Sequence, residues 1–381
     1  MSDRRRILVF AHDAQLYGAS RSMLSLLEVL RVDTSVELMV FVPQKGPLLE
    51  SLNKLNIRAK IVSYPPNANF YSGKKKNFVW FLKKLKKYLL FYKRIKKEVR
   101  QFNPDVIYTN TSVVYWGALI AYISFKKHVW HIREMRGAYD IHHDFGFSFF
   151  KTLLLRSNSI ICNSGAVVKD YGLLNKKKVS VVYNGLFSIH EVDVLYTNRK
   201  KAGEVLQFGI VAAVHPAKGQ LEVLKAMNIW RKGSCRNFKI FIIGGILDED
   251  YYQKIKEFAQ KNQLENEIIF TGFLDNVDPY YYSLDILICG SISEAFGRVI
   301  IESMVRGVFV IARNTGGIPE VIENGENGLL YEDLEDLIDC LKWYEKSSSA
   351  VSLMKDKAVN IVKKRFCIER YSNEILNILT A

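Results

Sequence analysis

Residues 291–330, SISEAFGRVIIESMVRGVFVIARNTGGIPEVIENGENGLL, contain two carboxylates, Glu294 and Glu302, which stand eight positions apart with Gly297 between them. A buried strand is expected before this loop, and the apolar spacing predicts a helix from Val299 to Arg306. Gly297 then lies at the helix N-terminus, where free backbone N–H groups favour a phosphate. The carboxylates would repel a phosphate and suit neutral hydroxyls instead. The stretch therefore indicates two sugar rings on either side of a diphosphate, with an acidic loop and a solvated helix position as the simpler alternative.

The totals of the chain predict two domains with opposite charge. A length of 381 residues is too great for one ordinary core. Residues 1–183 carry 31 Lys and Arg against 12 Asp and Glu, whereas residues 184–381 carry 23 against 27. The first half is therefore expected to meet something anionic. Five scattered cysteines suggest a reducing cytosol without disulfides, and the N-terminus shows no signal-peptide core.

The first half alternates strand-like and helical segments. A short apolar run, Ile7 to Phe10, leads through a polar loop with Gly18 into an amphipathic helix, Met23 to Leu30. This order is typical of the start of a doubly wound α/β domain, in which ligands bind at the carboxyl ends of the strands. Further strands are predicted at Val36 to Val42, Arg58 to Val62, Val106 to Tyr108, Val129 to Ile132, Ser159 to Asn163 and Val179 to Tyr183. The alternation favours a parallel sheet covered on both faces.

The second half begins with a predicted linker, Phe187 to Gly203, which lacks an apolar period. A second α/β domain is expected to open at Leu206, with Lys218 in the first loop placed to reach an anion at the strand ends. The acidic run Asp248 to Asp250 has a form that can hold a divalent metal. A role in the first turn of a helix is preferred, because acids there complement the helix dipole. Thr315 to Gly317 forms a turn whose glycines could bring backbone amides to a substrate.

One segment of the first half is unusually basic. From Lys74 to Arg100 there are twelve basic residues and one acid, interleaved with aromatic and leucine side chains. A basic amphipathic helix of this kind favours binding to an anionic membrane surface. A solvated surface helix is the alternative, and no nucleic-acid recognition motif accompanies the charge. The residues proposed to meet the membrane or the acceptor are Lys83, Lys84, Lys86 and Lys87.

Histidines are interpreted with care. His131 lies at the carboxyl end of a predicted strand, where it could serve a substrate by hydrogen bonding or could be a core residue. His12, at the end of the first strand, leaves the same choice open. The pair His142 and His143 falls in a predicted loop without acids at metal-ligand spacing. No metal site is therefore assigned.

Several blocks together resemble retaining glycosyltransferases of family 4. They are AAVHPAKG at 212–219, IIGG at 242–245, TGF at 271–273, SEAFGRVIIESMVRG at 293–307 and GGIPEVIENGENGLL at 316–330. The resemblance, including the E-x7-E pattern, covers the second half strongly and the first half more loosely. It implies the GT-B architecture, α/β with two Rossmann-like domains facing across a cleft, at 1–183 and 184–364. It also implies a C-terminal helix, residues 365–381, that crosses back to the first domain.

The resemblance implies roles for particular residues. The catalytic residues would be His131, Lys218 and Glu294, and the donor would be bound by Gly18, Lys218, Gly272, Glu294, Phe296, Gly297, Arg298 and Glu302. Lys218 would neutralise the leaving diphosphate, Glu294 would hold the transferred sugar and Glu302 the ribose. Family members commonly carry an arginine five positions before this lysine, but here that position is Ala213. The diphosphate then lacks one cation, unless Arg298 or Arg133 replaces it.

The expected activity is transfer of a sugar from a nucleotide-sugar, UDP-linked rather than GDP-linked, without a metal or other cofactor. The basic helix suggests a lipid-linked or glycan acceptor and a cytoplasmic protein on the inner face of the membrane. Nucleic acid is not an expected partner. Two alternatives stay open at this point: a nucleotide-sugar epimerase, and a catalytically silent subunit that binds a nucleotide-sugar.

Overall fold

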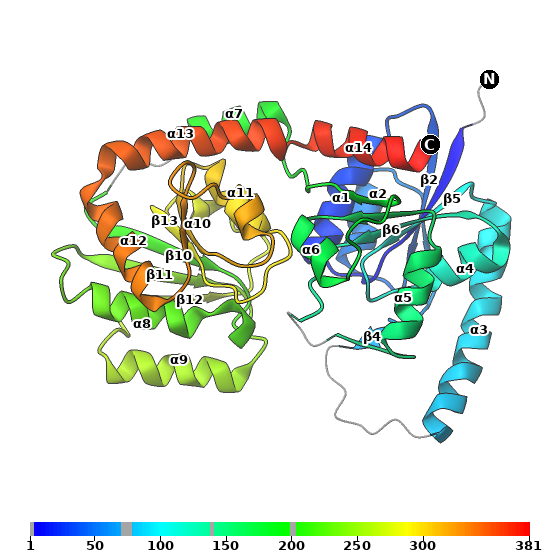
Figure 1. The fold of residues 1–381 in the computed structure, drawn as a ribbon, viewed down its shortest axis with the longest axis horizontal. Helices are drawn as coiled ribbons and strands as arrows, with labels where there is room; N and C mark the ends of the chain where they lie inside the picture. The colour runs from blue at the N-terminus through cyan, green and yellow to red at the C-terminus, as the bar shows by residue number, and fades with distance from the viewer. Residues whose placement is uncertain (1–3, 70–77, 138–140, 199–202) are drawn as a thin grey trace. The chain divides into compact units, whose positions relative to one another are not determined.

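The computed structural model describes residues 4–69, 78–137, 141–198 and 203–381. It divides into two compact units, of which unit 1 comprises Met1–Gly185 and Ile368–Ala381 and unit 2 comprises Leu186–Cys367. Each unit holds a parallel sheet with helices packed around it (Figure 1). The predicted two-domain α/β architecture is therefore confirmed.

Unit 1 is built on a seven-stranded sheet in the order β3-β2-β1-β5-β6-β8-β9. Its strands are β1 (Arg5–Phe10), β2 (Val36–Val42), β3 (Ala59–Ile61), β5 (Val106–Asn110), β6 (Lys127–Ile132), β8 (Ser159–Cys162) and β9 (Val179–Val181). Its helices are α1 (Gly18–Leu30), α2 (Pro47–Lys54), α3 (Phe78–Phe102), α4 (Trp116–Ser124), α5 (Phe147–Arg156), α6 (Gly165–Asp170) and α14 (Ile368–Thr380). A small antiparallel pair, β4 (Ala68–Asn69) with β7 (His142–His143), lies beside them.

Unit 2 is built on a six-stranded sheet in the order β12-β11-β10-β13-β14-β15. Its strands are β10 (Leu206–Val211), β11 (Phe238–Ile243), β12 (Ile268–Gly272), β13 (Ile286–Cys289), β14 (Phe309–Arg313) and β15 (Leu329–Tyr331). Its helices are α7 (Ile189–Thr197), α8 (Gln220–Trp230), α9 (Glu249–Lys261), α10 (Asp278–Tyr281), α11 (Arg298–Met304), α12 (Leu334–Lys346) and α13 (Ser348–Arg365), with short 3-10 turns at Pro216–Lys218 and Ile318–Glu320.

The two sheets have separate cores made by the predicted apolar strands. In unit 1, Val9, Val40 and Val129 belong to one buried cluster, which also includes Tyr371 and Ile375 of α14. The C-terminal helix is thus part of the core of unit 1. In unit 2, residues of β10, β11 and β13 pack with those of α8 and α12. Burial of these apolar side chains is the main stabilising contribution in both units.

Three sequence predictions differ from the structure. The segment predicted to be a linker contains α7, because Ser188 and Glu191 form a reciprocal capping box that satisfies its first N–H groups. Helix α1 begins at Gly18, five residues earlier than Met23, although its first turn is polar. His142 and His143 form a short strand instead of a loop. Of the predicted basic helix, residues 74–77 lie outside the described part of the chain.

The uncharged run from Val106 to Phe125 is resolved as predicted into strand β5, a polar loop and helix α4. Within the described residues, no helix is both long enough and apolar enough to cross a membrane.

Candidate functional site

The candidate site of unit 2 lies where the strand order of the sheet reverses. Strands β10 and β13 are neighbours there, and their chain connections run in opposite directions across the sheet. In open parallel sheets, ligands bind beyond the carboxyl ends of the strands at such a point. Lys218 follows β10 and Glu294 follows β13, so the topology brings the two predicted residues to one edge.

Two glycines hold these loops in backbone contact. Gly219 has φ of +67°, and a Cβ atom on it would lie 2.2 Å from the carbonyl oxygen of Gly290. Ile292 N–H also donates to Ala217 O across the same contact, at 2.9 Å. Since neither glycine leaves room for a side chain, the loops approach closely enough for Lys218 Nζ to lie 2.9 Å from Glu294 Oε2.

The Glu294 carboxylate is held in its ionised form. Burial raises the pKa of Glu294. The charge of Lys218 and the hydrogen bonds from Lys218, Ser291 and the backbone of Gly297 all lower it, and together they outweigh burial. The net result is a pKa below the usual value for glutamate. The side chain keeps 22% of its surface exposed, and that of Lys218 keeps 17%. Both groups can therefore be reached by a ligand.

The turn formed by Gly316 and Gly317 contacts the backbone of Glu294 and fixes its position. Gly316 has φ of +55°, and a Cβ atom on it would lie 2.1 Å from the carbonyl oxygen of Glu294. Gly317 N–H donates to that same oxygen at 2.8 Å. Thr315 Oγ1 donates to Ile292 O at 2.8 Å. The amide of Gly317, expected to serve a substrate, is thus used to fix the loop that carries Glu294.

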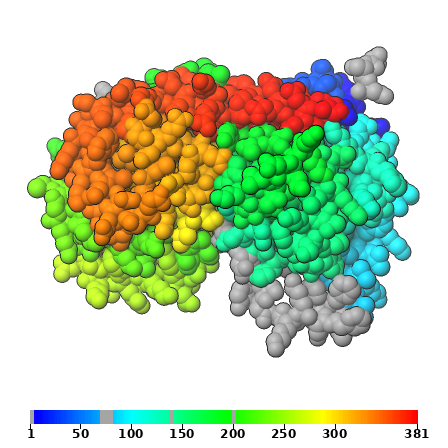
Figure 2. All heavy atoms as spheres, in the orientation of Figure 1, coloured from blue at the N-terminus to red at the C-terminus, as the bar shows by residue number. Residues whose placement is uncertain are grey.

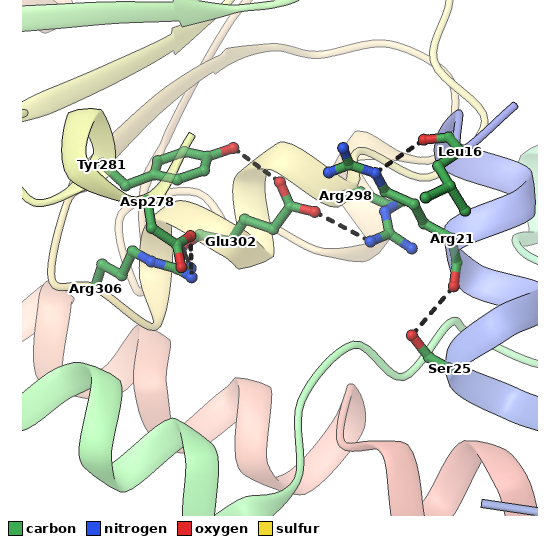
Figure 3. A network of polar contacts seen from close by, with 8 residues as sticks. All are labelled: Leu16, Arg21, Ser25, Asp278, Tyr281, Arg298, Glu302 and Arg306. Carbon is green, nitrogen blue, oxygen red and sulfur yellow. Dashed lines mark hydrogen bonds and ion pairs between the residues drawn. The ribbon is translucent and has the colours of Figure 1, made fainter. Parts of the chain in front are cut away.

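The second carboxylate, Glu302, lies on α11 and has two partners (Figure 3). Tyr281 OH donates to its Oε2 at 2.8 Å, and Arg298 Nη2 donates to its Oε1 at 3.2 Å. Arg306 Nη1 donates to the Glu302 carbonyl at 2.7 Å, while its Nη2 pairs with Asp278. These contacts fix the backbone and the carboxylate of Glu302 before any ligand is bound.

Helix α11 starts as predicted, with Gly297 at its N-cap in a left-handed conformation, φ +86°. Phe296 is buried with its ring 5.7 Å from that of Phe366, so a donor could meet only its backbone. Gly272, at the end of β12, has φ of +70°, and no described atom lies within 4 Å of a Cβ built there. Donor binding by these three residues stays a prediction.

Arg298, one of the two arginines expected to replace the cation missing at Ala213, already has a carboxylate partner within unit 2. Arg298 is engaged with Glu302. Gly244 lies directly against the backbone beside Ala213, because a Cβ atom added to it would be 2.3 Å from Ala212 O. Lys218 is therefore the cation that the structure brings to Glu294.

The acidic run before α9 caps the helix, as preferred from the sequence. Asp248 Oδ1 accepts from Tyr251 N–H at 2.8 Å, and Glu249 and Asp250 occupy the first turn. Among the described residues, no group of three or more His, Cys, Asp or Glu is arranged to hold a metal ion.

In unit 1 the predicted residues lie at the carboxyl edge of its own sheet. Gly18 is the first residue of α1, whose N-cap Tyr17 makes no side-chain capping bond. His131 is fully buried, and its Nδ1 lies 2.7 Å from Tyr108 OH. Burial, and then the nearby charge of Arg133, place the pKa of His131 well below its usual value. The imidazole is therefore neutral, and direct contact of its ring with a substrate stays a prediction.

Arg133 is the centre of a buried network that sequence reasoning did not anticipate. Its Nε and Nη1 donate to Asn110 Oδ1 and Asn184 Oδ1, each at 2.6 Å. Its Nη2 donates to Tyr371 OH at 2.7 Å, which ties α14 to the strand ends of unit 1. The guanidinium is thus used for structure within unit 1. The sequence offered one signal for this network, namely polar residues at strand ends: Asn110 is the last residue of β5, and Arg133 directly follows β6.

The basic residues of α3 do not all face solvent. Lys83, Lys86 and Lys87 are exposed. Lys84 instead pairs with the buried Asp144 at 2.8 Å and keeps only 18% of its side chain exposed. Its charge is used inside unit 1, so Lys84 drops out of the predicted membrane surface.

Two family models cover most of the chain. The model for Glycosyltransferase Family 4 matches residues 18–186, and the model for Glycosyl transferases group 1 matches residues 197–360. The chain belongs to the glycosyltransferases of the family 4 type.

Similar proteins agree with this assignment. An uncharacterized glycosyltransferase of Methanocaldococcus jannaschii is 33% identical over 189 residues, 49% of each chain. The N-acetyl-alpha-D-glucosaminyl L-malate synthase of Bacillus anthracis is 31% identical over 32% of this chain and 29% of its own. In these two comparisons the matched segment of this chain spans about half or less of the relative's own length. The solved structure of Anabaena HepE with UDP and glucose superposes with a TM-score of 0.81 at 20% identity, covering 99% of this chain and 100% of that one. This likeness confirms the GT-B fold.

Proposed function

We propose that the protein transfers a sugar from a nucleotide diphosphate to an acceptor hydroxyl with retention at the anomeric carbon. The observation that carries the proposal is the pair Lys218 and Glu294, 2.9 Å apart at the switch point of unit 2. One member suits a phosphate and the other suits sugar hydroxyls, so a single ligand with both groups can engage both. HepE, which has the same fold, was solved with UDP and glucose, and this supports a uridine nucleotide.

The bond changes place these residues in defined roles. The bond between the anomeric carbon and the diphosphate oxygen breaks, a bond to the acceptor oxygen forms, and the hydroxyl proton passes to the departing phosphate. Lys218 lies where negative charge grows on the leaving group, so its attraction is strongest in the transition state. Glu294 would accept hydrogen bonds from the sugar, and Glu302 from the ribose diol.

The reaction as proposed uses no metal, and its charge balance rests on one lysine. A single ammonium against a diphosphate leaves the site anionic once the donor is bound. The silent nucleotide-sugar-binding subunit is favoured by one specific observation, Ala213 in the place of the expected arginine.

The acceptor is proposed to be a lipid-linked or glycan molecule at the inner face of the membrane, with the protein bound peripherally there. Support comes from the exposed lysines of α3 and from the net positive charge of residues 1–183. Anionic headgroups would hold unit 1 at the surface where such an acceptor is found.

The test is transfer of radiolabelled sugar from a panel of nucleotide-sugars into membrane extract. Wild-type protein is expected to label a lipid or glycan fraction with one donor, and Glu294→Gln is expected to lose the activity while keeping its fold. If a donor binds but no fraction is labelled, the silent subunit is the better description. If no donor binds, the proposal is wrong.

A further inference from the structure

Two hydrogen-bond donors face the same ring nitrogen of His131. The hydroxyl of Tyr108, on the neighbouring strand β5, lies 2.7 Å from His131 Nδ1, and Arg133 Nη2 lies 3.3 Å from it. A guanidinium carries only N–H donors and cannot accept a hydrogen bond. A hydrogen on Nδ1 would therefore point at the positive charge and the N–H groups of Arg133, whereas a lone pair there accepts from them. The contacts favour an Nδ1 that carries no proton.

Tyr108 has a hydrogen to donate to this nitrogen. Burial raises the pKa of Tyr108 above its usual value, so its hydroxyl stays protonated. Arg133 Nη2 also donates to the Tyr108 oxygen, at 3.5 Å. The oxygen of Tyr108 thus faces a donor, and its own hydrogen is left for His131. Both neighbours of Nδ1 act as donors toward it.

Arg133 cannot turn away from His131, because each of its nitrogens has a partner. Asn110 and Asn184 accept from Nε and Nη1, and Tyr371 OH accepts from Nη2. Tyr371 lies on the buried face of α14, whose outer atoms reach the surface of unit 1 in Figure 2, where they are red. The guanidinium beside Nδ1 is thus held by β5, by the loop after β9 and by α14.

The other ring nitrogen, Nε2, must then carry the proton. The lowered pKa of His131 keeps the imidazole neutral, and a neutral imidazole has one N–H. His131 is fully buried, and among the residues that the structure describes Nε2 has no hydrogen-bond partner. A buried donor without an acceptor is destabilising. His131 is the last residue but one of β6, so it lies near the edge of the sheet where ligands bind. An oxygen from outside the chain would satisfy this donor.

We propose that Tyr108 and Arg133 are positioning residues that lock His131 in its Nε2–H tautomer, so that His131 donates a hydrogen bond to a substrate oxygen and takes no proton from it. The inference rests on the proposed transfer function for the substrate and adds what His131 does in it. A base would need a lone pair at Nε2, the nitrogen that the two donors leave protonated. This agrees with a hydroxyl proton that passes to the departing phosphate.

The first experiment measures the tautomer in the full chain. Proton–nitrogen correlation spectra of protein with isotope-labelled histidines separate a protonated ring nitrogen from an unprotonated one, and the signals lost in His131→Gln are those of His131. We expect a protonated Nε2, an unprotonated Nδ1 and no titration from about pH 5 to 8. Among the described residues, the titratable and charged groups that contact the ring are Tyr108, Arg133 and Tyr371, and the charge of Arg133 disfavours a second one. A protonated Nδ1, or titration in this range, would overturn the proposal.

Tyr108→Phe tests the positioning role. It removes one donor at Nδ1, so the Nδ1 resonance should move toward that of a nitrogen without a hydrogen bond, while Arg133 keeps the proton on Nε2. Tyr64→Phe is the matched control, because it removes a buried hydroxyl of unit 1 that bonds to Ala11 O and Phe41 O. It should leave the signals of His131 in place. Equal shifts in both variants would contradict the role of Tyr108, and a proton that moves to Nδ1 in Tyr108→Phe would contradict that of Arg133.

Activity separates a hydrogen-bond donor from a base. His131→Gln keeps an N–H group near the position of Nε2, so transfer of radiolabelled sugar should fall only about threefold to tenfold. Loss of a base would cost roughly 100-fold or more. A loss of that size in His131→Gln, with UDP-glucose bound as in wild type by calorimetry, would refute the donor role. If wild type transfers no sugar from any donor, the proposed function is wrong, and the spectra still decide the tautomer.

Discussion

Replacing Gly316 by alanine is expected to damage the candidate site through the loop that carries Glu294. A left-handed φ of +55° costs an alanine about 1 kcal/mol. Its Cβ would also lie 2.1 Å from Glu294 O, so the turn must move and lose the 2.8 Å bond from Gly317 N–H. That bond and the contact add about 2 kcal/mol. The total of about 3 kcal/mol corresponds to a fall of roughly 6–12 °C in the unfolding temperature of unit 2.

Gly325→Ala is the matched control. Gly325 also has positive φ, +80°, but no described atom lies within 4 Å of the added Cβ. It should cost only the conformational part, about 1 kcal/mol. Scanning calorimetry compares the two variants, and titration with UDP-glucose compares their donor affinity. We expect at least tenfold weaker binding for Gly316→Ala alone. Equal stability and equal donor binding in both variants would refute the role assigned to the close contact.

Three further outcomes follow from the contacts. Tyr281→Phe frees Glu302 Oε2 and should raise the donor KM about threefold to tenfold with kcat unchanged in steady-state assays, since the hydrogen bond that positions the carboxylate is lost and about 1 kcal/mol of donor binding with it. Lys218→Met should cost about a hundredfold in kcat by the same assay. It should also reduce the acid loss of stability that comes from Glu294: the lowered pKa gives stabilisation that is present above the pKa of the unfolded state and lost as pH falls through the folded-state pKa, and removal of the lysine takes most of that lowering away. Arg133→Lys should destabilise unit 1 by about 3 kcal/mol and speed hydrogen exchange in α14, whereas unchanged exchange would contradict the tether.

The strands and most helices could be predicted because local pattern decides them. Ile286 to Cys289 is a buried apolar run between polar loops, and it forms β13 with the predicted bounds. Helix α7 could have been found from the Ser188 and Glu191 capping pair, but its short apolar period is weak. The start of α1 at Gly18 could not be predicted, because its first turn is polar and has a low intrinsic preference for helix. That turn is helical because the rest of α1 packs on the sheet.

The geometry of the site could be predicted only in part. Lys218 and Glu294 are 76 positions apart, and the sequence indicates merely that both follow strands. Their 2.9 Å contact depends on the backbone approach of Gly219 to Gly290, which is a property of the folded sheet. The partners of Glu302 and the burial of Lys84 likewise arise from tertiary packing. No local pattern distinguishes Lys84 from its exposed neighbours.

The pairing of Lys218 with Glu294 has a consequence for selectivity. With both groups ionised the pair is neutral as a whole, and a ligand that separates it must satisfy both partners, since each is only partly exposed. Inorganic phosphate can replace Glu294 beside the ammonium, but it leaves the carboxylate without its cation. A free sugar can satisfy the carboxylate but not the lysine. A nucleotide-sugar carries an anion and hydroxyls in one molecule, so it alone among these ligands can exchange the internal contact for two external ones.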